Sequence, residues 1–136
     1  MPLTKSQRFR QKNAVEILDF FGAVWYNRSI TTEWGKIRMV KHMIIWKMSD
    51  EVADKAAKAQ EIKAALEGLV GKIEGLLEMH ILTDRYDCSA GDVMMDSSFA
   101  DLAALQAYQK HPLHVEIANG IVRPAMCQRL SFDYEV

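Results

Sequence analysis

The fold is decided by one stretch of sequence, Val40-Lys-His-Met-Ile-Ile-Trp-Lys-Met48. Successive side chains of a β-strand point to opposite faces of the sheet, and this run carries large apolar residues on both of its faces. It therefore predicts a strand that is packed on two sides. One face holds Val40, His42, Ile44, Trp46 and Met48, and the other holds Lys41, Met43, Ile45 and Lys47.

The residues that follow this strand predict a helix and a second strand. Apolar residues recur at helical spacing from Val52 to Leu69, with Ser49 and Asp50 as candidate N-caps and Gly71 as the expected stop. Residues 76–86 alternate as a strand. One face of that strand is expected to hold Leu77, Met79 and Ile81, and the other Glu78, His80 and Leu82.

The remaining sequence predicts a third strand, a broken helix and a last strand. Residues 92–98 are less apolar, so we expect this strand to lie partly at a sheet edge, and Ser97 or Ser98 to cap the next helix. That helix should end at His111, because Pro112 disfavours helical geometry in the residue before it. A second helical stretch follows, and residues 125–134 form the closing strand. One face of that strand is expected to hold Met126, Gln128, Leu130, Phe132 and Tyr134.

The element order defines the fold class as α+β. The order β-α-β-β-α-β predicts a ferredoxin-like domain, with helices on one face of a four-stranded antiparallel sheet. The helices leave the second apolar face of the sheet uncovered, and an uncovered apolar face implies a partner. We expect two copies to pair face to face as a homodimer, which gives a dimeric α+β barrel.

Length and composition place the chain among ordinary globular proteins. The 136 residues are 49% hydrophobic and 26% charged, which suits one domain with a core. The net charge of −1 gives no global attraction to nucleic acid or to an anionic membrane, and no run of 18 apolar residues could cross one. Two cysteines outside any CxxC motif suit free thiols, and we expect a cytoplasmic protein.

The charge changes sign near Met39. Residues 1–38 hold seven Lys/Arg against three Asp/Glu, whereas residues 39–136 hold ten against fifteen. This change indicates two different pieces, an extension at 1–38 and a domain at 39–136. The extension is interpreted as an appended helix, a disordered arm, or sequence upstream of a misassigned start.

Histidine and tyrosine are the candidate chemical groups. Imidazole titrates near neutral pH and can take a proton, and a phenol nearby can hydrogen-bond to a substrate carbonyl. The histidines have no metal-ligand spacing and the glycines form no phosphate loop, so we expect neither a metal nor another cofactor.

Three motifs carry a resemblance to a known family. They are Val40-Lys-His42 in the first strand, Tyr108-Gln-Lys-His-Pro-Leu-His114 after the second helix, and Phe132-Asp-Tyr134 in the last strand. The chain from Met39 onward resembles the stress-responsive A/B-barrel (Dabb) family of small dimeric α+β barrels. That family includes plant stress-responsive proteins, uncharacterised bacterial proteins and a polyketide cyclase.

The resemblance implies roles for particular residues. By likeness to the cyclase, His114 would be the general base, Tyr108 would assist it, and His42 would line the pocket. A further pocket histidine of the cyclase corresponds to Val93 in this sequence, so one polar group of that pocket is missing.

Two functions from different classes stay open. The first is a non-catalytic stress-related or assembly protein whose main property is the stability of its dimer. The second is a protein that binds a small apolar carbonyl compound, or a cofactor-independent cyclase or isomerase that uses His114 and Tyr108. Trp46 and His111 complete the expected pocket. The alternative, purely structural interpretations are that His42 is a core histidine, that His111 only holds the helix break through backbone hydrogen bonds, and that His114 is a structural histidine.

Overall fold

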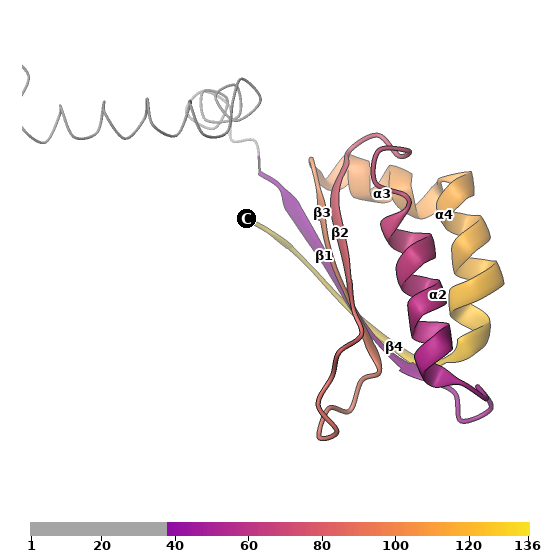
Figure 1. Cartoon of the computed structure of the whole chain (residues 1–136). Coiled ribbons are helices and arrows are strands. Elements are labelled where there is room, and N and C mark those ends of the chain that lie inside the picture. The colour runs from indigo at the N-terminus through magenta and orange to yellow at the C-terminus, as the bar shows by residue number, and fades with distance from the viewer. Residues whose placement is uncertain (1–37) are drawn as a thin grey trace, which may run out of the picture. The chain divides into compact units, whose positions relative to one another are not determined.

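The structure is a computed structural model, and it describes residues 38–136. Apart from Arg38, the N-terminal extension lies outside this range, and so do the three interpretations of it. In the described part, four strands and three α-helices follow one another in the expected order (Figure 1). They are β1 (Val40–Met48), α2 (Lys55–Glu67), β2 (Leu76–Leu82), β3 (Val93–Phe99), α3 (Leu102–Lys110), α4 (Pro112–Ile117) and β4 (Met126–Glu135).

The sheet has the ferredoxin-like order β2-β3-β1-β4, and all neighbouring strands are antiparallel. This confirms the predicted fold class. The third strand, however, was expected partly at an edge and lies inside the sheet. Its polar residues have partners there: the Ser97 hydroxyl donates to the His42 carbonyl at 2.7 Å, and the Ser98 hydroxyl accepts from Lys41 at 3.1 Å. Polar residues whose hydrogen bonds are satisfied by a neighbouring strand can occupy an interior position.

The alternation predicted for β1 agrees with the structure. Its helix-facing residues are all buried, and Val40, Ile44, Trp46 and Met48 belong to the main apolar core. All three helices cover this one face of the sheet (Figure 1). The other face, called the outer face below, carries Met43 and Ile45.

The helices α2 and α3 begin at aspartates that were not among the expected caps. The Asp54 carboxylate accepts from the Ala57 amide at 3.0 Å and starts α2, later than the expected caps Ser49 and Asp50. Asp101 starts α3 by accepting from the Ala104 amide at 2.7 Å. Each carboxylate satisfies an amide that the first helical turn leaves without a partner.

Two irregularities shift the expected strand faces. The register of β2 slips between Leu76 and Glu78, so Leu76, and not Leu77, joins Met79 on the buried side. A second slip, between Lys47 and Met48, separates Met126 from the other apolar residues of β4. A β-bulge inserts one extra residue into a strand, so the side chains on its two sides alternate out of step and face opposite sides of the sheet.

The outer face exposes a group of apolar side chains on neighbouring strands. Pairing places Leu130 opposite Ile45 and Phe132 opposite Met43. Leu130 is 72% exposed and Phe132 is 69% exposed. We call this group the outer apolar face; it consists of Met43, Ile45, Leu82, Met94, Leu130, Phe132 and Tyr134.

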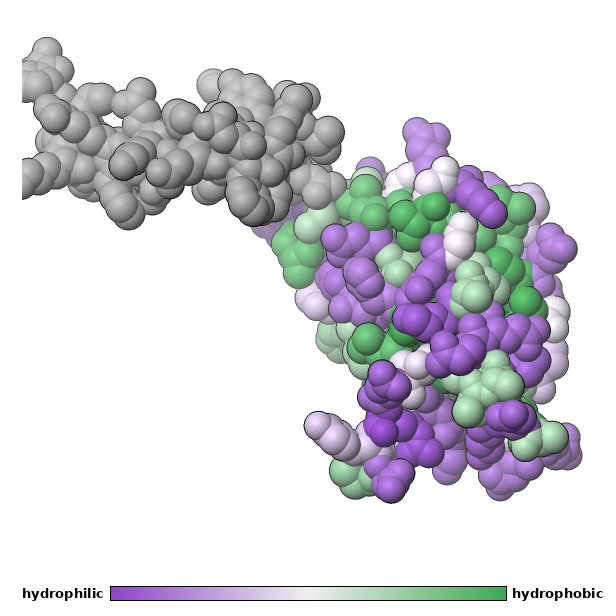
Figure 2. Space-filling view, viewed as in Figure 1, coloured by the Kyte–Doolittle hydropathy of each residue, from purple (hydrophilic) through white to green (hydrophobic). Residues whose placement is uncertain are grey.

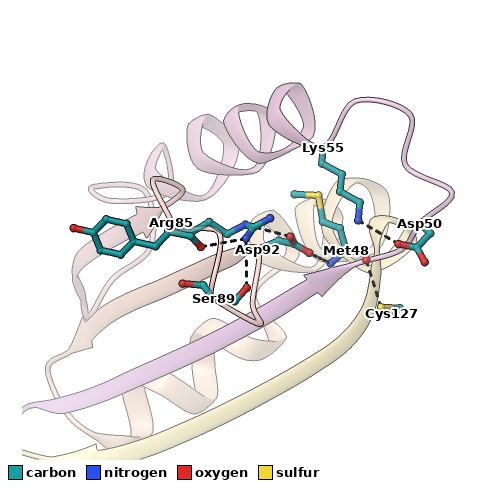
Figure 3. A network of polar contacts seen from close by, with 8 residues as sticks. Met48, Asp50, Lys55, Arg85, Ser89, Asp92 and Cys127 are labelled. Atoms are coloured by element: carbon teal, nitrogen blue, oxygen red, sulfur yellow. Dashed lines mark hydrogen bonds and ion pairs between the residues drawn. The ribbon is translucent and has the colours of Figure 1, made fainter.

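A polar network fixes the loop between β2 and β3 to the end of β1 (Figure 3). One Asp92 oxygen accepts from the Met48 amide at 2.7 Å, and the other lies 3.5 Å from Arg85. The Arg85 guanidinium also donates to the Ser89 carbonyl at 3.3 Å. Polar residues predominate at this end of the domain in the space-filling view (Figure 2).

Candidate functional site

A cavity of about 270 Å³ lies between the helix-facing side of the sheet and the helices α3 and α4. This is close to the lower limit of typical small-molecule pockets. The sheet provides its apolar floor and one polar rim, and the helices provide the opposite wall. The lining residues are His42, Ile44, Trp46, Leu66, Met95, Tyr108, Gln109, His114, Ala118, Val122, Arg123 and Arg129.

His42 lies on β1 and is 2% exposed. Its Nδ1 is hydrogen-bonded to the carboxylate of Asp133, which lies directly opposite on β4. A carboxylate oxygen can only accept in this pair, so the ring donates from Nδ1. Nε2 takes no part in the pair. The cross-strand pair therefore fixes the orientation of a buried imidazole at the cavity.

Tyr108 lies on α3 and is 1% exposed. Its ring packs on Phe99 at a centroid distance of 4.9 Å and on His114 at 4.2 Å. Burial raises the pKa of Tyr108, and the charge of Arg129 opposes this effect. The phenol therefore stays protonated at neutral pH and can donate a hydrogen bond.

The break in the helix before Pro112 places His114 against Tyr108. His111 has extended geometry (φ −64°, ψ 132°), so α3 ends and α4 begins in a new direction. The His114 Nδ1 lies 3.3 Å from the Gln109 carbonyl, which closes the turn. The rings of two residues six positions apart in the sequence thus lie in contact, tilted by 37° to each other.

The environment of His114 favours its neutral form. Burial lowers the pKa of His114, the hydrogen bond to Gln109 opposes this, and the charges of Arg123, His42 and Arg129 lower the pKa further. A carbonyl can only accept a hydrogen bond, so the neutral ring carries its hydrogen on Nδ1. The unprotonated nitrogen is then Nε2.

Four of the five residues expected at the site line the cavity, and one does not. The four are His114, Tyr108, His42 and Trp46. His111 was also placed in the expected pocket but does not line this cavity, whereas the alternative that it holds the helix break agrees with the structure. The Nδ1 of His111 accepts from the Leu113 amide at 3.1 Å and caps α4, so its ring is already used by the backbone.

Sequence reasoning missed three polar residues of the cavity wall, Gln109, Arg123 and Arg129. Arg129 lies opposite Trp46 in the ladder and therefore on the helix-facing side of β4. Its alternation with the apolar Leu130 was the signal that could have revealed it. Val93, which occupies the place of a family pocket histidine, does not line the cavity, whereas Met95 of the same strand does.

A larger groove lies on the outer face. It has a volume of about 590 Å³ and is lined by Ile45, Leu82, Met94 and Leu130 together with the loop between β2 and β3. None of its lining residues is a histidine, and its walls are mainly apolar. The chemistry of the two hollows therefore differs.

Two features are absent from residues 38–136. No helix there has the length and apolar character needed to span a membrane. In the same residues, no group of three His, Cys, Asp or Glu side chains lies close enough to hold a metal ion.

The sheet order and the cavity beneath the helices define a ferredoxin-like α+β domain with a histidine- and tyrosine-lined pocket. The chain belongs to the Dabb family, the stress responsive A/B barrel domain, whose family model matches residues 40–136. The resemblance of the sequence to this family is thereby confirmed. No curated protein matches the chain significantly.

Solved structures share the fold. A dimeric protein of unknown function from Bacteroides fragilis is 28% identical (TM-score 0.66), with 72% of this chain and 96% of that one covered. A protein from Arabidopsis thaliana is also 28% identical (TM-score 0.60), with 70% and 92% covered. A hydroxynitrile lyase from Passiflora edulis is 18% identical (TM-score 0.58), with 72% and 93% covered. The similar proteins include dimers, and most have no stated function.

Proposed function

We propose that the domain binds a small carbonyl compound in the cavity and moves a proton on it without a cofactor. The observation that carries this proposal is that His114, Tyr108 and His42 line one cavity of about 270 Å³. Apolar side chains of Ile44 and Trp46 at the same cavity suit the body of such a compound. The size of the cavity limits the ligand to about one ring with a short chain.

His114 is the proposed base. Its lowered pKa leaves the imidazole neutral near pH 7, and the hydrogen bond to Gln109 leaves the Nε2 lone pair as the proton acceptor. A base of this kind can take a proton from a carbon next to a carbonyl group. General base catalysis by a positioned histidine accelerates a reaction by roughly 10²–10⁴-fold.

Tyr108 is the proposed partner of the carbonyl oxygen. Loss of the carbon-bound proton places negative charge on that oxygen, and a buried hydroxyl that remains protonated can stabilise this charge by donating a hydrogen bond. Such a step is common to cyclisation and isomerisation of carbonyl compounds.

We also infer that the protein is a homodimer formed through the outer apolar face. The exposure of Leu130 and Phe132 supports this inference, as do the similar structures that are described as dimeric. The same face favours the second candidate function, a stress-related or assembly role without catalysis. In that case the pairing itself is the main property of the protein.

Hydrogen exchange at carbon separates the two candidates. Acetophenone would be incubated with the protein in D₂O, and loss of the signal of the protons next to its carbonyl followed by NMR against a sample without protein. We expect exchange with the native chain and with the control His80→Gln, which replaces an exposed histidine. Exchange should fall by roughly 10²-fold or more in His114→Gln. If the native chain neither binds nor exchanges any compound of a wider carbonyl panel, the catalytic proposal fails and the assembly role replaces it.

A further inference from the structure

The polar wall of the cavity contains two arginines and no acidic residue. This positive charge is particular to the cavity, since the domain as a whole is acidic: residues 39–136 hold fifteen acidic against ten basic residues. Arg129 and Arg123 both lower the pKa of His114, which agrees with their position on the cavity wall. The cavity is therefore cationic within an acidic domain.

Neither arginine is neutralised by a carboxylate in the described part of the chain. Within residues 38–136, Arg129 forms no ion pair, and the Asp133 carboxylate on the same strand is hydrogen-bonded to His42. Arg123 donates to the side-chain oxygen of Asn119, which is uncharged. Two guanidinium groups at one small cavity thus keep their charge available.

The two arginines reach the cavity from different elements of the fold. Arg129 belongs to β4, whereas Arg123 follows a π-helical turn, Ala118–Val122, at the end of α4. Ala118 and Val122 of this turn line the cavity themselves. Departures of this kind from α-helical geometry are frequent at functional sites.

We infer that the pocket takes a small organic carboxylate, with its carboxylate bound by Arg129 and Arg123 and its apolar part against Ile44, Trp46 and Met95. This inference rests on the proposed function and narrows the ligand from a carbonyl compound to an oxo acid. A guanidinium group matches a carboxylate through two parallel hydrogen bonds. The apolar floor favours an organic acid over inorganic phosphate, which has no apolar part to bury.

Binding of a matched pair of compounds tests the inference. Benzoate and benzamide have nearly the same shape, but only benzoate is charged at neutral pH. Isothermal titration calorimetry should show benzoate bound at least tenfold more tightly. Arg129→Gln should weaken benzoate by about 10–100-fold, because a charge-assisted hydrogen bond is lost, and should leave benzamide unchanged.

Two further variants separate loss of charge from loss of structure. Arg129→Lys keeps the charge but loses the paired hydrogen bonds, so its affinity for benzoate should lie between those of the native chain and of Arg129→Gln. Lys72→Gln removes an exposed charge outside the residues that line the cavity and should change neither compound. A thermal melt of each variant should match that of the native chain, since Arg129 is exposed.

The possible failures are distinguishable. Equal affinity for the two compounds, unchanged in Arg129→Gln, would overturn the carboxylate inference and leave the neutral carbonyl pocket standing. Phosphate that displaces benzoate at comparable concentration would also overturn it, because the apolar part would then contribute nothing. Absence of binding by benzoate, benzamide and every compound of the carbonyl panel would overturn both this inference and the proposed function.

Discussion

Replacing Leu130 and Phe132 together by alanine is expected to separate the two subunits. These side chains are 72% and 69% exposed in the single subunit, so they contribute little to its own core. Complete burial of one such side chain is worth about 1.5–3 kcal/mol, and the exposed share is therefore worth about 1.5 kcal/mol each. A twofold interface contains each residue twice, which brings the loss to about 6 kcal/mol and weakens the dimer by about 10⁴-fold.

Sedimentation equilibrium at micromolar concentration measures this change. The native chain should sediment as a dimer and the double variant as a folded monomer with an unchanged far-ultraviolet circular dichroism spectrum. The double variant Leu102→Ala/Val115→Ala is the control, because it removes exposed apolar residues from the helical layer. A native chain that is a monomer, or a Leu130/Phe132 variant that remains a dimer of unchanged affinity, would refute pairing through this face.

Three further predictions concern the single domain. Gly75→Ala should lower the free energy of unfolding by about 2–3 kcal/mol, because Gly75 has φ +83° and an added Cβ would lie 2.5 Å from the Ala104 Cβ; Gly120→Ala, with open space around it, is the control for chemical denaturation. Asp101→Ala should cost about 1 kcal/mol by removing the cap of α3, and Asp101→Asn should restore most of this stability in the same assay. Because the pKa of His114 is lowered on folding, the unfolded chain binds more protons as the pH falls below about 6.5, and stability is lost there. The melting temperature of His114→Gln should accordingly fall less than that of the native chain between pH 7 and pH 5, and equal falls would contradict the lowered pKa.

The strands were the most predictable part of the fold. In β1 the alternation of side chains was enough to identify the helix-facing residues from Val40 to Met48. A repeat of two residues is a strong local signal of a strand. The slips in β2 and between β1 and β4 could not be predicted. A bulge depends on how two strands pair, and the sequence of one strand contains no record of its partner. The choice of Asp54 over Ser49 as a cap has a similar cause, since both are good caps and packing of the helix decides between them.

The candidate site was only partly predictable. The family motif indicated Tyr108 and His114, and the break at Pro112 explains why they meet. Arg129 was missed because only the apolar residues of β4 were followed, and their polar neighbours on the opposite face were not assigned to the cavity. Assigning both faces of a strand would have found it.

The central position of β1 makes its length critical. An insertion or deletion of one residue within this strand would turn every later side chain to the opposite side of the sheet. If the change falls at Lys41, the side chains of Met43 and Ile45 would lie under the helices, while His42 and Trp46 would face outward. This shift of register would destroy both the cavity and the subunit contact. Natural length variation is therefore expected in the connection after β2, around Tyr86, and not in β1.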